Sequence, residues 1–173
     1  GRSIVTPPAA PPEELRVDIT TPATSAPAQF ALSPDGQRIV VVASGDGPQR
    51  LWLRTLDRTS AVPLPGTDGA QMPFWSPDGR SIGFFAAGKL QRVDIAGGAP
   101  RILANAPTAR GGTWNREGVI LFGSSAGLSR VAAAGGDAVV ATRPDVQRQQ
   151  SHRWPHFLPD GRRFVFQVTG AEQ

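Results

Sequence analysis

The sequence contains no cysteine, a single lysine (Lys89) and no long apolar run among its 173 residues. Without cysteine the chain can form no disulfide and no thiolate metal site, although this absence does not select a cellular compartment. No uninterrupted apolar stretch approaches the roughly 20 residues that a membrane-spanning helix needs. The 20 glycines and 17 prolines instead divide the apolar residues into short runs. We therefore expect a β-rich segment that makes no contact with a membrane.

Catalytic signatures are missing as well. The sequence has neither the His-Arg-Asp nor the Asp-Phe-Gly motif of protein kinases, and no serine stands in a Gly-x-Ser-x-Gly nucleophile turn. The glycine pairs Gly97-Gly98 and Gly135-Gly136 separate apolar runs of strand length, whereas a phosphate-binding loop leads into a helix. We therefore expect no catalytic residue and no cofactor in this segment.

Positive charge dominates, because 18 basic residues outnumber 14 acidic ones and give a net charge of +4 with a pI near 11.1. Such a pI would ordinarily favour nucleic-acid binding. Here the arginines are scattered along the chain, one or two in each predicted strand or turn. This distribution indicates a solvated surface and predicts no nucleic-acid partner.

The segment Met72–Phe85 is the clearest copy of a motif that the chain repeats. An aromatic-rich strand leads into the turn Ser76–Gly79, with sequence Ser-Pro-Asp-Gly, and an apolar strand follows it. In such a turn proline sets φ at the second position, the aspartate bonds the backbone ahead of it, and glycine adopts a positive φ. Related turns follow Phe30 and His156, and a degenerate copy of the turn lies at Asn115–Gly118. Each copy predicts a tight hairpin.

The spacing of these copies predicts the fold. The acidic turn residues Asp35, Asp78, Glu117 and Asp160 are separated by 43, 39 and 43 residues. A period of roughly 40 residues suits a four-stranded propeller blade. Aspartates could alternatively form a metal or acid–base site, but in separate blades they would lie too far apart to converge. We therefore assign a structural role in the turns to the following residues: Asp35, Gly36, Asp78, Gly79, Asp160 and Gly161.

The predicted fold class is all-β, a partial β-propeller of about three and a half four-stranded blades. Residues 1–14, with four prolines, read as an extended linker. Alternating apolar and polar residues over Leu15–Thr20 predict a closing strand within a connection at 15–26. The blades are expected at 27–68, 69–106 and 107–142, with a half blade at 151–168.

An incomplete ring would leave apolar blade faces uncovered. Propellers close with about 4–8 blades, and each blade buries its faces on its neighbours. We therefore expect that further blades, or a second chain, complete the ring.

The Ser-Pro-Asp-Gly repeats, the aromatics before them and the Gly-Gly turns resemble the TolB-type propeller repeat. Longer strings, including Leu51–Arg54, Pro73–Asp78, Arg110–Asn115 and Ser151–Pro155, are similar to the C-terminal propeller region of bacterial membrane-spanning, eukaryotic-type serine/threonine kinases. This similarity covers residues 15–168, about the first half of the longer propeller expected in that family.

The resemblance implies a non-catalytic, extracytoplasmic sensor or interaction propeller that binds a protein, a peptide or a small ligand. Phosphoryl transfer would belong to a kinase domain elsewhere in the parent chain. Two alternatives remain: an accessory propeller that gates a hydrolase or peptidase domain, and a free periplasmic scaffold propeller. The sequences that flank the segment in its parent chain would distinguish among the three.

Candidate binding residues precede the acidic turn residues by six or seven positions. At seven positions stand Gln71, Arg110 and Arg153, and at six stands Trp154. These positions begin the first strand of each blade, which lines the channel of a propeller. Arginine offers forked donors that suit carboxylates and phosphates. We therefore expect an acidic peptide tail or a small anionic ligand at this channel mouth.

His152 completes the predicted ligand-binding set. It stands four residues before His156, and residues four apart share one face of a regular strand, so the pair could approach a metal. Pro155 disturbs that strand and the sequence fixes no third ligand, so we predict no metal site. The alternative for the whole set is structural, with the arginines bonding strand carbonyls and Trp154 packing between blades.

Overall fold

The computed structural model describes residues 18–25, 29–145 and 147–170. Within these residues the regular structure consists of β-strands alone. No helix among them has the length and apolar character required to cross a membrane. The predicted linker at 1–14 and residues 15–17 of the predicted closing strand lie outside the described residues.

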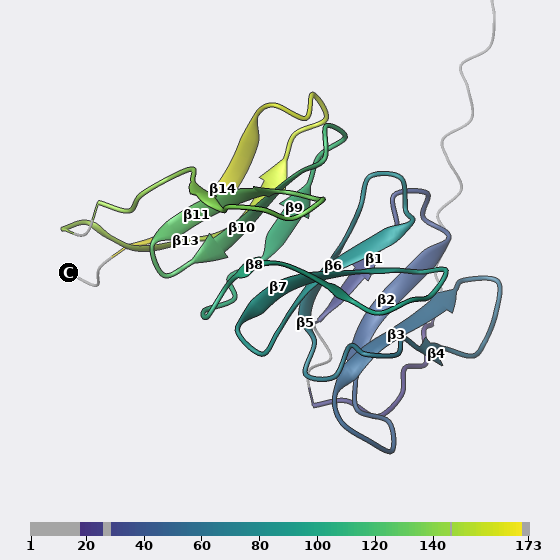
Figure 1. The fold of residues 1–173 in the computed structure, drawn as a ribbon. Coiled ribbons are helices and arrows are strands. Elements are labelled where there is room, and N and C mark those ends of the chain that lie inside the picture. Colours follow the sequence, from purple (N-terminus) through teal and green to yellow (C-terminus); the bar gives the residue numbers. More distant parts are fainter. Residues whose placement is uncertain (1–17, 26–28, 146, 171–173) are drawn as a thin grey trace, which may run out of the picture.

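The strands form four antiparallel sheets, each from consecutive segments of the chain (Figure 1). The first sheet contains β1 (Phe30–Leu32), β2 (Arg38–Ala43), β3 (Arg50–Thr55) and β4 (Val62–Pro63). The second contains β5 (Gln71–Trp75), β6 (Ser81–Ala86), β7 (Lys89–Asp94) and β8 (Arg101–Asn105). The third contains β9 (Gly112–Trp114), β10 (Val119–Ser124), β11 (Gly127–Ala132) and β12 (Val139–Val140). The fourth contains β13 (Gln149–Phe157) and β14 (Phe164–Gly170).

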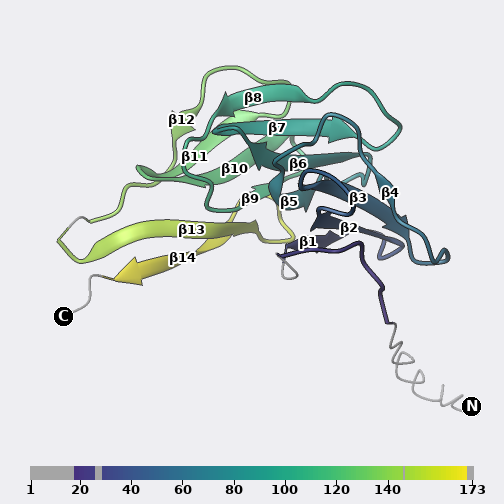
Figure 2. The ribbon, with the colours of Figure 1, turned by 90° about the horizontal axis from the view of Figure 1, so that it is seen from below.

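The sheets stack face to face as consecutive wedges of an arc. Figure 2 shows β1, β5 and β9 toward the inside of the arc and β4, β8 and β12 toward its rim. One apolar cluster, which includes Val40, Leu51 and Phe84, joins the first two sheets. A second, which includes Phe85 and Phe122, joins the second and third sheets. The predicted all-β partial propeller of about three and a half blades is thereby confirmed.

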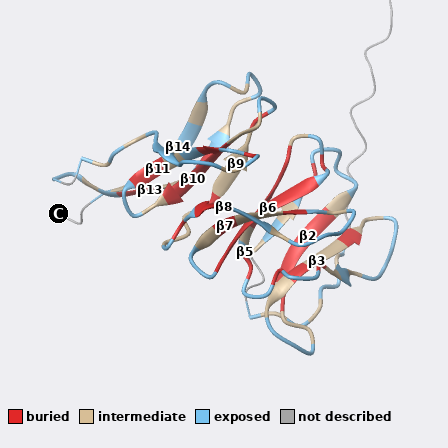
Figure 3. Ribbon diagram, viewed as in Figure 1, coloured by how far each residue is buried: buried red, intermediate tan, exposed pale blue. Residues whose placement is uncertain are grey.

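The second strands of the complete sheets are buried on both faces. Every residue of β6 is buried, and β2 and β10 are buried apart from their ends, as the red ribbons in Figure 3 show. Side chains alternate between the two faces of a strand, so a strand covered on both sides must be apolar throughout. This requirement explains the continuous apolar runs that follow each turn.

Residues 18–25 lie against the outward face of the first sheet. The Arg54 Nη1 donates to the Thr20 carbonyl (3.2 Å), and the Ser44 N–H donates to the Ala23 carbonyl (2.9 Å). Arg54 stands opposite Ile39 in the β2–β3 ladder, so the two side chains lie on the same face of the first sheet. Residues 18–20, the described part of the predicted closing strand, form no strand: the carbonyl of Thr20 bonds a side chain rather than a neighbouring strand.

The turn aspartates organise the hairpins through side-chain hydrogen bonds. The Asp35 carboxylate accepts bonds from the Ser33 hydroxyl (2.5 Å) and the Gln37 N–H (3.0 Å). Asp78 accepts equivalent bonds from the Ser76 hydroxyl (2.6 Å) and the Arg80 N–H (3.0 Å). The glycines that follow the three aspartates share a left-handed backbone: Gly36 (φ 68°), Gly79 (φ 66°) and Gly161 (φ 68°).

The last turn uses arginine where the others use serine. Asp160 accepts bonds from the N–H groups of Arg162 and Arg163 (3.0 Å each) and from the Arg163 Nε (2.6 Å). In the degenerate copy of the turn, the side-chain carbonyl of Asn115 accepts a hydrogen bond from the Val119 N–H (2.8 Å). A side-chain oxygen therefore supports the hairpin in all four repeats.

These bonds stabilise the charged carboxylates. The backbone N–H and guanidinium of Arg163, together with the N–H of Arg162, lower the pKa of Asp160 from 3.8 to about 2. The Ser33 hydroxyl and the Gln37 N–H lower the pKa of Asp35, and the Ser76 hydroxyl and the Arg80 N–H lower that of Asp78.

We predict that stability falls as the pH drops from about 4 to about 2. A folded-state pKa below the unfolded value of 3.8 stabilises the fold above that value, and the contribution is lost as the pH approaches the folded pKa of about 2. Urea unfolding across this pH range would measure the loss. Asp160→Asn should be less stable than the parent at pH 6 and should show a shallower decline, and identical pH profiles would contradict the prediction.

Candidate functional site

The inner strands of the second and fourth sheets each contain a β-bulge at the equivalent position of the repeat. The strand register shifts between Gln71 and Phe74, and again between Arg153 and His156. Within these bulges Met72 and Trp154 have left-handed backbones, with φ of 49° and 51°. Gly111, at the same position of the third repeat, has φ of 82°. Large side chains adopt this conformation only where the surrounding structure imposes it.

Cross-sheet contacts hold the bulges in place. The Met72 N–H donates to the Gln29 Oε1 (2.9 Å), and the Trp154 N–H donates to the Arg110 carbonyl (2.8 Å). Gly111 leaves room for the indole, because a Cβ added there would lie 2.6 Å from the Trp154 Cε3. Each bulge is thus fixed by the repeat that precedes it.

The bulged positions surround a cavity of about 230 Å³, here called the axial cavity. Its lining comes from the starts of all four repeats: Gln29, Phe30, Met72, Pro73, Gly111, Gly112 and Trp154. Trp154 is 52% exposed, so much of its indole faces solvent. A second hollow of about 380 Å³ continues along the inner strands toward the turns of Pro34, Pro77 and Pro159. Together they form a trough along the inside of the arc.

Trp154 lines this cavity, and Arg110, another predicted binding residue, lies outside the lining and bonds Trp154. Arg110 bonds Trp154 through its carbonyl, and its backbone packs so closely on Gly123 that a Cβ added there would lie 2.7 Å from the Arg110 oxygen. The Arg110 Nε is buried and has no hydrogen-bond partner among the described residues.

The other predicted residues are placed differently. The Arg153 Nε donates to the Ser151 hydroxyl on its own strand (2.7 Å). Gln71 is exposed and lines a separate hollow of about 130 Å³ together with Ala109. Arg153 therefore has a structural bond in this structure, and Gln71 lies beside the axial cavity rather than in its lining.

His152 lies in the interior and not in the lining of the axial cavity. Its side chain is 4% exposed, its Nδ1 lies 2.8 Å from the Thr142 hydroxyl and its Nε2 lies 3.0 Å from the Gln149 Oε1. Its ring packs on that of Phe166, with centroids 4.7 Å apart. Both ring nitrogens are engaged, so the residue joins the third and fourth sheets.

The bulge also separates His152 from His156. Their ladder partners are Val168 and Val165, three residues apart on β14, so the two histidines face opposite sides of the sheet. The extra residue of the bulge lies between Arg153 and His156, so the strand is interrupted at Pro155, where the sequence predicted a disturbance. In the described part of the chain no three histidine, aspartate or glutamate side chains gather as metal ligands.

The sequence argument missed the left-handed bulge itself. The available signal was Gly111, which occupies the position held by Met72 and Trp154 in the neighbouring repeats. Glycine at one copy of a repeat, where the other copies carry large residues, can mark a positive φ shared by all of them. That signal would have placed Met72 among the candidate residues.

No family model matches the sequence, and no curated protein matches it. Solved structures do resemble the fold. A protein assigned as TolB from Agrobacterium tumefaciens matches with a TM-score of 0.71 and 20% identity over 86% of this chain. A chain of a nidogen/laminin complex matches with a TM-score of 0.65 and 9% identity over 82% of this chain. An oligogalacturonate lyase in complex with manganese matches with a TM-score of 0.52 and 20% identity over 75% of this chain.

These similarities identify the fold as that of a TolB-like β-propeller. The chain spans 57% of the matched TolB chain, 56% of the nidogen/laminin chain and 42% of the lyase. At such identities the likeness concerns the fold alone, and one fold can support many functions. Function must therefore be argued from the axial cavity.

We predict that Trp154→Gly is more stable than Trp154→Ala by about 1 kcal/mol, because the left-handed backbone penalises a Cβ. Urea unfolding of the two variants measures the difference. Val165, at a regular position of β14, provides the control: there alanine should be the more stable replacement by about 0.5–1 kcal/mol. If alanine were also preferred at position 154, the backbone there would not be left-handed.

Proposed function

We propose that this chain is a non-catalytic binding propeller whose axial cavity receives an acidic peptide tail or a small anionic ligand. The observation that carries the proposal is the strained, half-exposed Trp154 at a cavity to which four successive repeats contribute. Strained backbone persists where the surrounding structure over-determines it, and it concentrates at ligand clamps.

Charge next to the cavity supports an anionic ligand, because Arg110 precedes Gly111 of the lining and its carbonyl bonds Trp154. The Arg110 Nε is buried and has no partner among the described residues, and leaving such a group unsatisfied costs about 1–3 kcal/mol. An incoming carboxylate or phosphate would offset that cost through a charge-assisted bond. Arg153 would join it by exchanging its bond to Ser151 for one to the ligand. The indole of Trp154 and the ring of Phe30 offer an apolar wall beside the charge.

We place this propeller in the extracytoplasmic sensor region of a receptor-like bacterial serine/threonine kinase. The support is the similarity of the strings that include Pro73–Asp78 and Ser151–Pro155 to the propeller region of such kinases. In this proposal ligand binding at the axial cavity is the sensory event, and further blades or a second chain complete the ring.

The binding site can be tested with a dye-labelled tetraglutamate peptide and with pyrophosphate as the small anion. We expect saturable binding of at least one probe, and a loss of about tenfold or more in the double variant Arg110→Ala/Arg153→Ala, since a hydrogen bond to a charged group contributes about 1.5–3 kcal/mol. Fluorescence anisotropy measures the peptide, and calorimetry measures pyrophosphate.

The matched control is Arg101→Ala, an exposed arginine on the outer strand β8, which should leave affinity unchanged. Tetralysine should not bind. Unchanged affinity in the double variant, or equal binding of tetralysine, would refute an anion site at this cavity.

The kinase assignment has a separate test in the reading frame of the parent gene. We expect a kinase domain and a membrane-spanning helix to precede this propeller in the parent chain. A downstream hydrolase domain would instead support an accessory propeller, and a signal peptide alone would support a free periplasmic scaffold.

A further inference from the structure

The third hairpin turn is one residue shorter than the other three. Six residues separate the paired ends of the inner and second strands in the first, second and fourth repeats (33–38, 76–81 and 158–163). In the third repeat five residues, 115–119, separate Trp114 from its partner Ile120. The turns lie side by side at one end of the blades. The shorter third turn therefore covers less of the seam between the second and third sheets.

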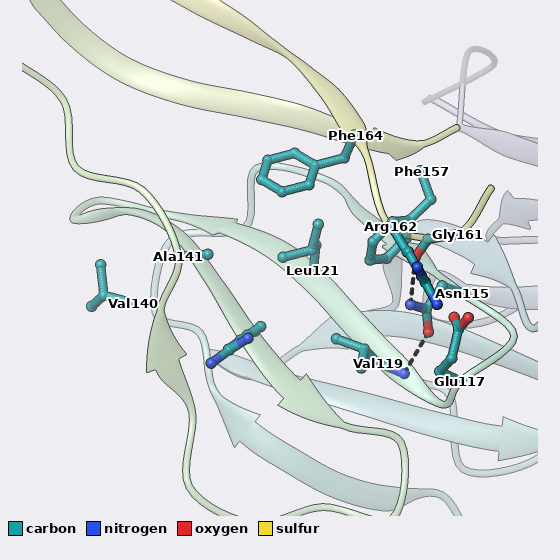
Figure 4. A pocket seen from close by; sticks show the side chains of 11 residues that line it. Asn115, Glu117, Val119, Leu121, Val140, Ala141, Phe157, Gly161, Arg162 and Phe164 are labelled. Atoms are coloured by element: carbon teal, nitrogen blue, oxygen red, sulfur yellow. Dashed lines mark hydrogen bonds between the residues drawn. The ribbon is translucent and has the colours of Figure 1, made fainter. Parts of the chain in front are cut away.

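Hydrogen bonds join the other neighbouring turns but not the second and third. The Arg38 Nη1 donates to the Gly79 carbonyl (3.4 Å) and so joins the first turn to the second. The Asn115 Nδ2 donates to the Gly161 carbonyl (2.8 Å) and joins the third to the fourth; Figure 4 shows Asn115 bonded to both Gly161 and Val119. In the described part of the chain no hydrogen bond joins the second turn to the third. A cleft of about 520 Å³ lies there instead, here called the inter-turn cleft.

The walls of the inter-turn cleft come from two complete, four-stranded sheets. Pro77 and Asp78 of the second turn line one side, and Trp114 and Arg116 line the other. Ala133, which follows β11, lines the part of the cleft away from the inner strands. Its carbonyl accepts a bond from the Arg92 Nη1 of the second sheet (3.0 Å). This bond holds the two walls together on that side.

Trp114 differs from its equivalent, Trp75, in the hydrogen bonding of the indole. Both residues end the inner strand of their sheet, β9 and β5 respectively. The Trp75 Nε1 donates to the Ala31 carbonyl of the preceding sheet (2.9 Å), and the side chain is buried. Trp114 is only half-buried, and its Nε1 has no hydrogen-bond partner among the described residues. This N–H group is not enclosed, since the Arg110 Nε is the one buried side-chain atom without a partner there. The indole N–H of Trp114 is therefore available to a ligand.

Charges of opposite sign line the inter-turn cleft without pairing. Asp78 accepts bonds from the Ser76 hydroxyl and the Arg80 N–H through its Oδ1, and its Oδ2 accepts none from the described residues. These bonds lower the pKa of Asp78, so its carboxylate is charged at neutral pH. Arg116 forms neither an ion pair nor a hydrogen bond within residues 18–25, 29–145 and 147–170. The cleft thus offers one anionic group, one cationic group and one free N–H donor.

We propose that the inter-turn cleft binds a free α-amino acid with an apolar side chain. The carboxylate of the amino acid accepts hydrogen bonds from the Arg116 guanidinium and the Trp114 Nε1, and its ammonium group donates to Asp78. Its side chain contacts Pro77 and Ala133.

A zwitterion is the ligand class that matches all three polar groups. Charge-assisted hydrogen bonds form at both of its ends. A simple anion would be repelled by Asp78, and a neutral sugar would leave both charges of the cleft without a counter-charge. The lining residues differ from those of the axial cavity, so this site is independent of the anion binding proposed there.

The test titrates the 173-residue chain with L-leucine, L-valine and L-phenylalanine and follows the indole N–H resonances of its four tryptophans by NMR. We expect at least one of the three to shift the Trp114 resonance saturably, with the Trp154 resonance of the axial cavity unchanged. Trp114→Phe identifies the resonance by its loss.

The same variants measure the contribution of each group by calorimetry. Trp114→Phe and Arg116→Gln should each weaken binding about tenfold or more, since each removes a hydrogen bond to a charged group. Arg80→Gln is the matched control, because Arg80 is an exposed arginine of the second turn outside the lining. Its charge is screened by salt, so affinity should stay within about twofold of the parent. Thermal melting of each variant confirms that the fold is retained.

Analogues of leucine separate the two ends of the zwitterion. N-acetyl-L-leucine lacks the ammonium group and L-leucine methyl ester lacks the carboxylate, so each should bind about tenfold or more weakly than L-leucine. Equal binding of the acetylated analogue would make the cleft an anion site, and saturable binding of glucose in place of the amino acids would make it a sugar site. Either result overturns the proposal, as does the absence of a saturable Trp114 shift with all three amino acids. A shift of Trp154 alone would place the amino acid in the axial cavity and would equally overturn it.

Discussion

A sheet whose two faces are both apolar must be covered on both sides, and this constraint governs the whole molecule. Burying one aliphatic or aromatic side chain contributes about 1.5–3 kcal/mol, whereas a typical hydrogen bond contributes a net of about 1 kcal/mol. The strands β2, β6 and β10 therefore derive their stability mainly from the sheets that flank them. Single bonds such as that from Arg92 to the Ala133 carbonyl act chiefly to set the register between neighbouring sheets. The apolar stacking of the sheets drives folding, and the polar contacts between neighbouring sheets set their alignment.

The same constraint explains why the sequence predicted the sheets but not the bulges in their inner strands. The turns of Asp35, Asp78 and Asp160 depend on residues that are close in sequence. The apolar runs that follow these turns indicate buried strands, so both features can be recognised from the sequence alone. The bulge at Trp154 depends on one added residue and on a bond to Arg110 in another sheet, and a count of alternating residues cannot detect either. The ring nitrogens of His152, a residue of the predicted ligand-binding set, lie within hydrogen-bond distance of Thr142 and Gln149, and the sequence alone indicated neither contact.

Repetition within one chain supplies an internal reference that a single domain lacks. Arg130 can be compared with Arg92, and Phe164 with Ile82, because the ladders place them at equivalent positions. A difference in burial between equivalent positions then reflects a difference in what surrounds them: Ile82 is fully buried and Phe164 is not. The comparison separates residues that are exposed in every repeat from those exposed at one position only.

The left-handed residues bear on the balance between stability and the binding proposed for the axial cavity. A non-glycine residue in that region costs about 1–3 kcal/mol, so Met72 and Trp154 reduce the stability that their sheets provide. Gly111 shows that this fold can satisfy the same backbone without strain, since it adopts φ of 82° just before β9 of the intervening sheet. The chain nevertheless carries a thioether and an indole at the two other positions, both in the lining of one cavity. Glycine would satisfy the backbone of the bulge at each of these positions, so the backbone conformation alone does not account for the two large side chains in the lining of the axial cavity.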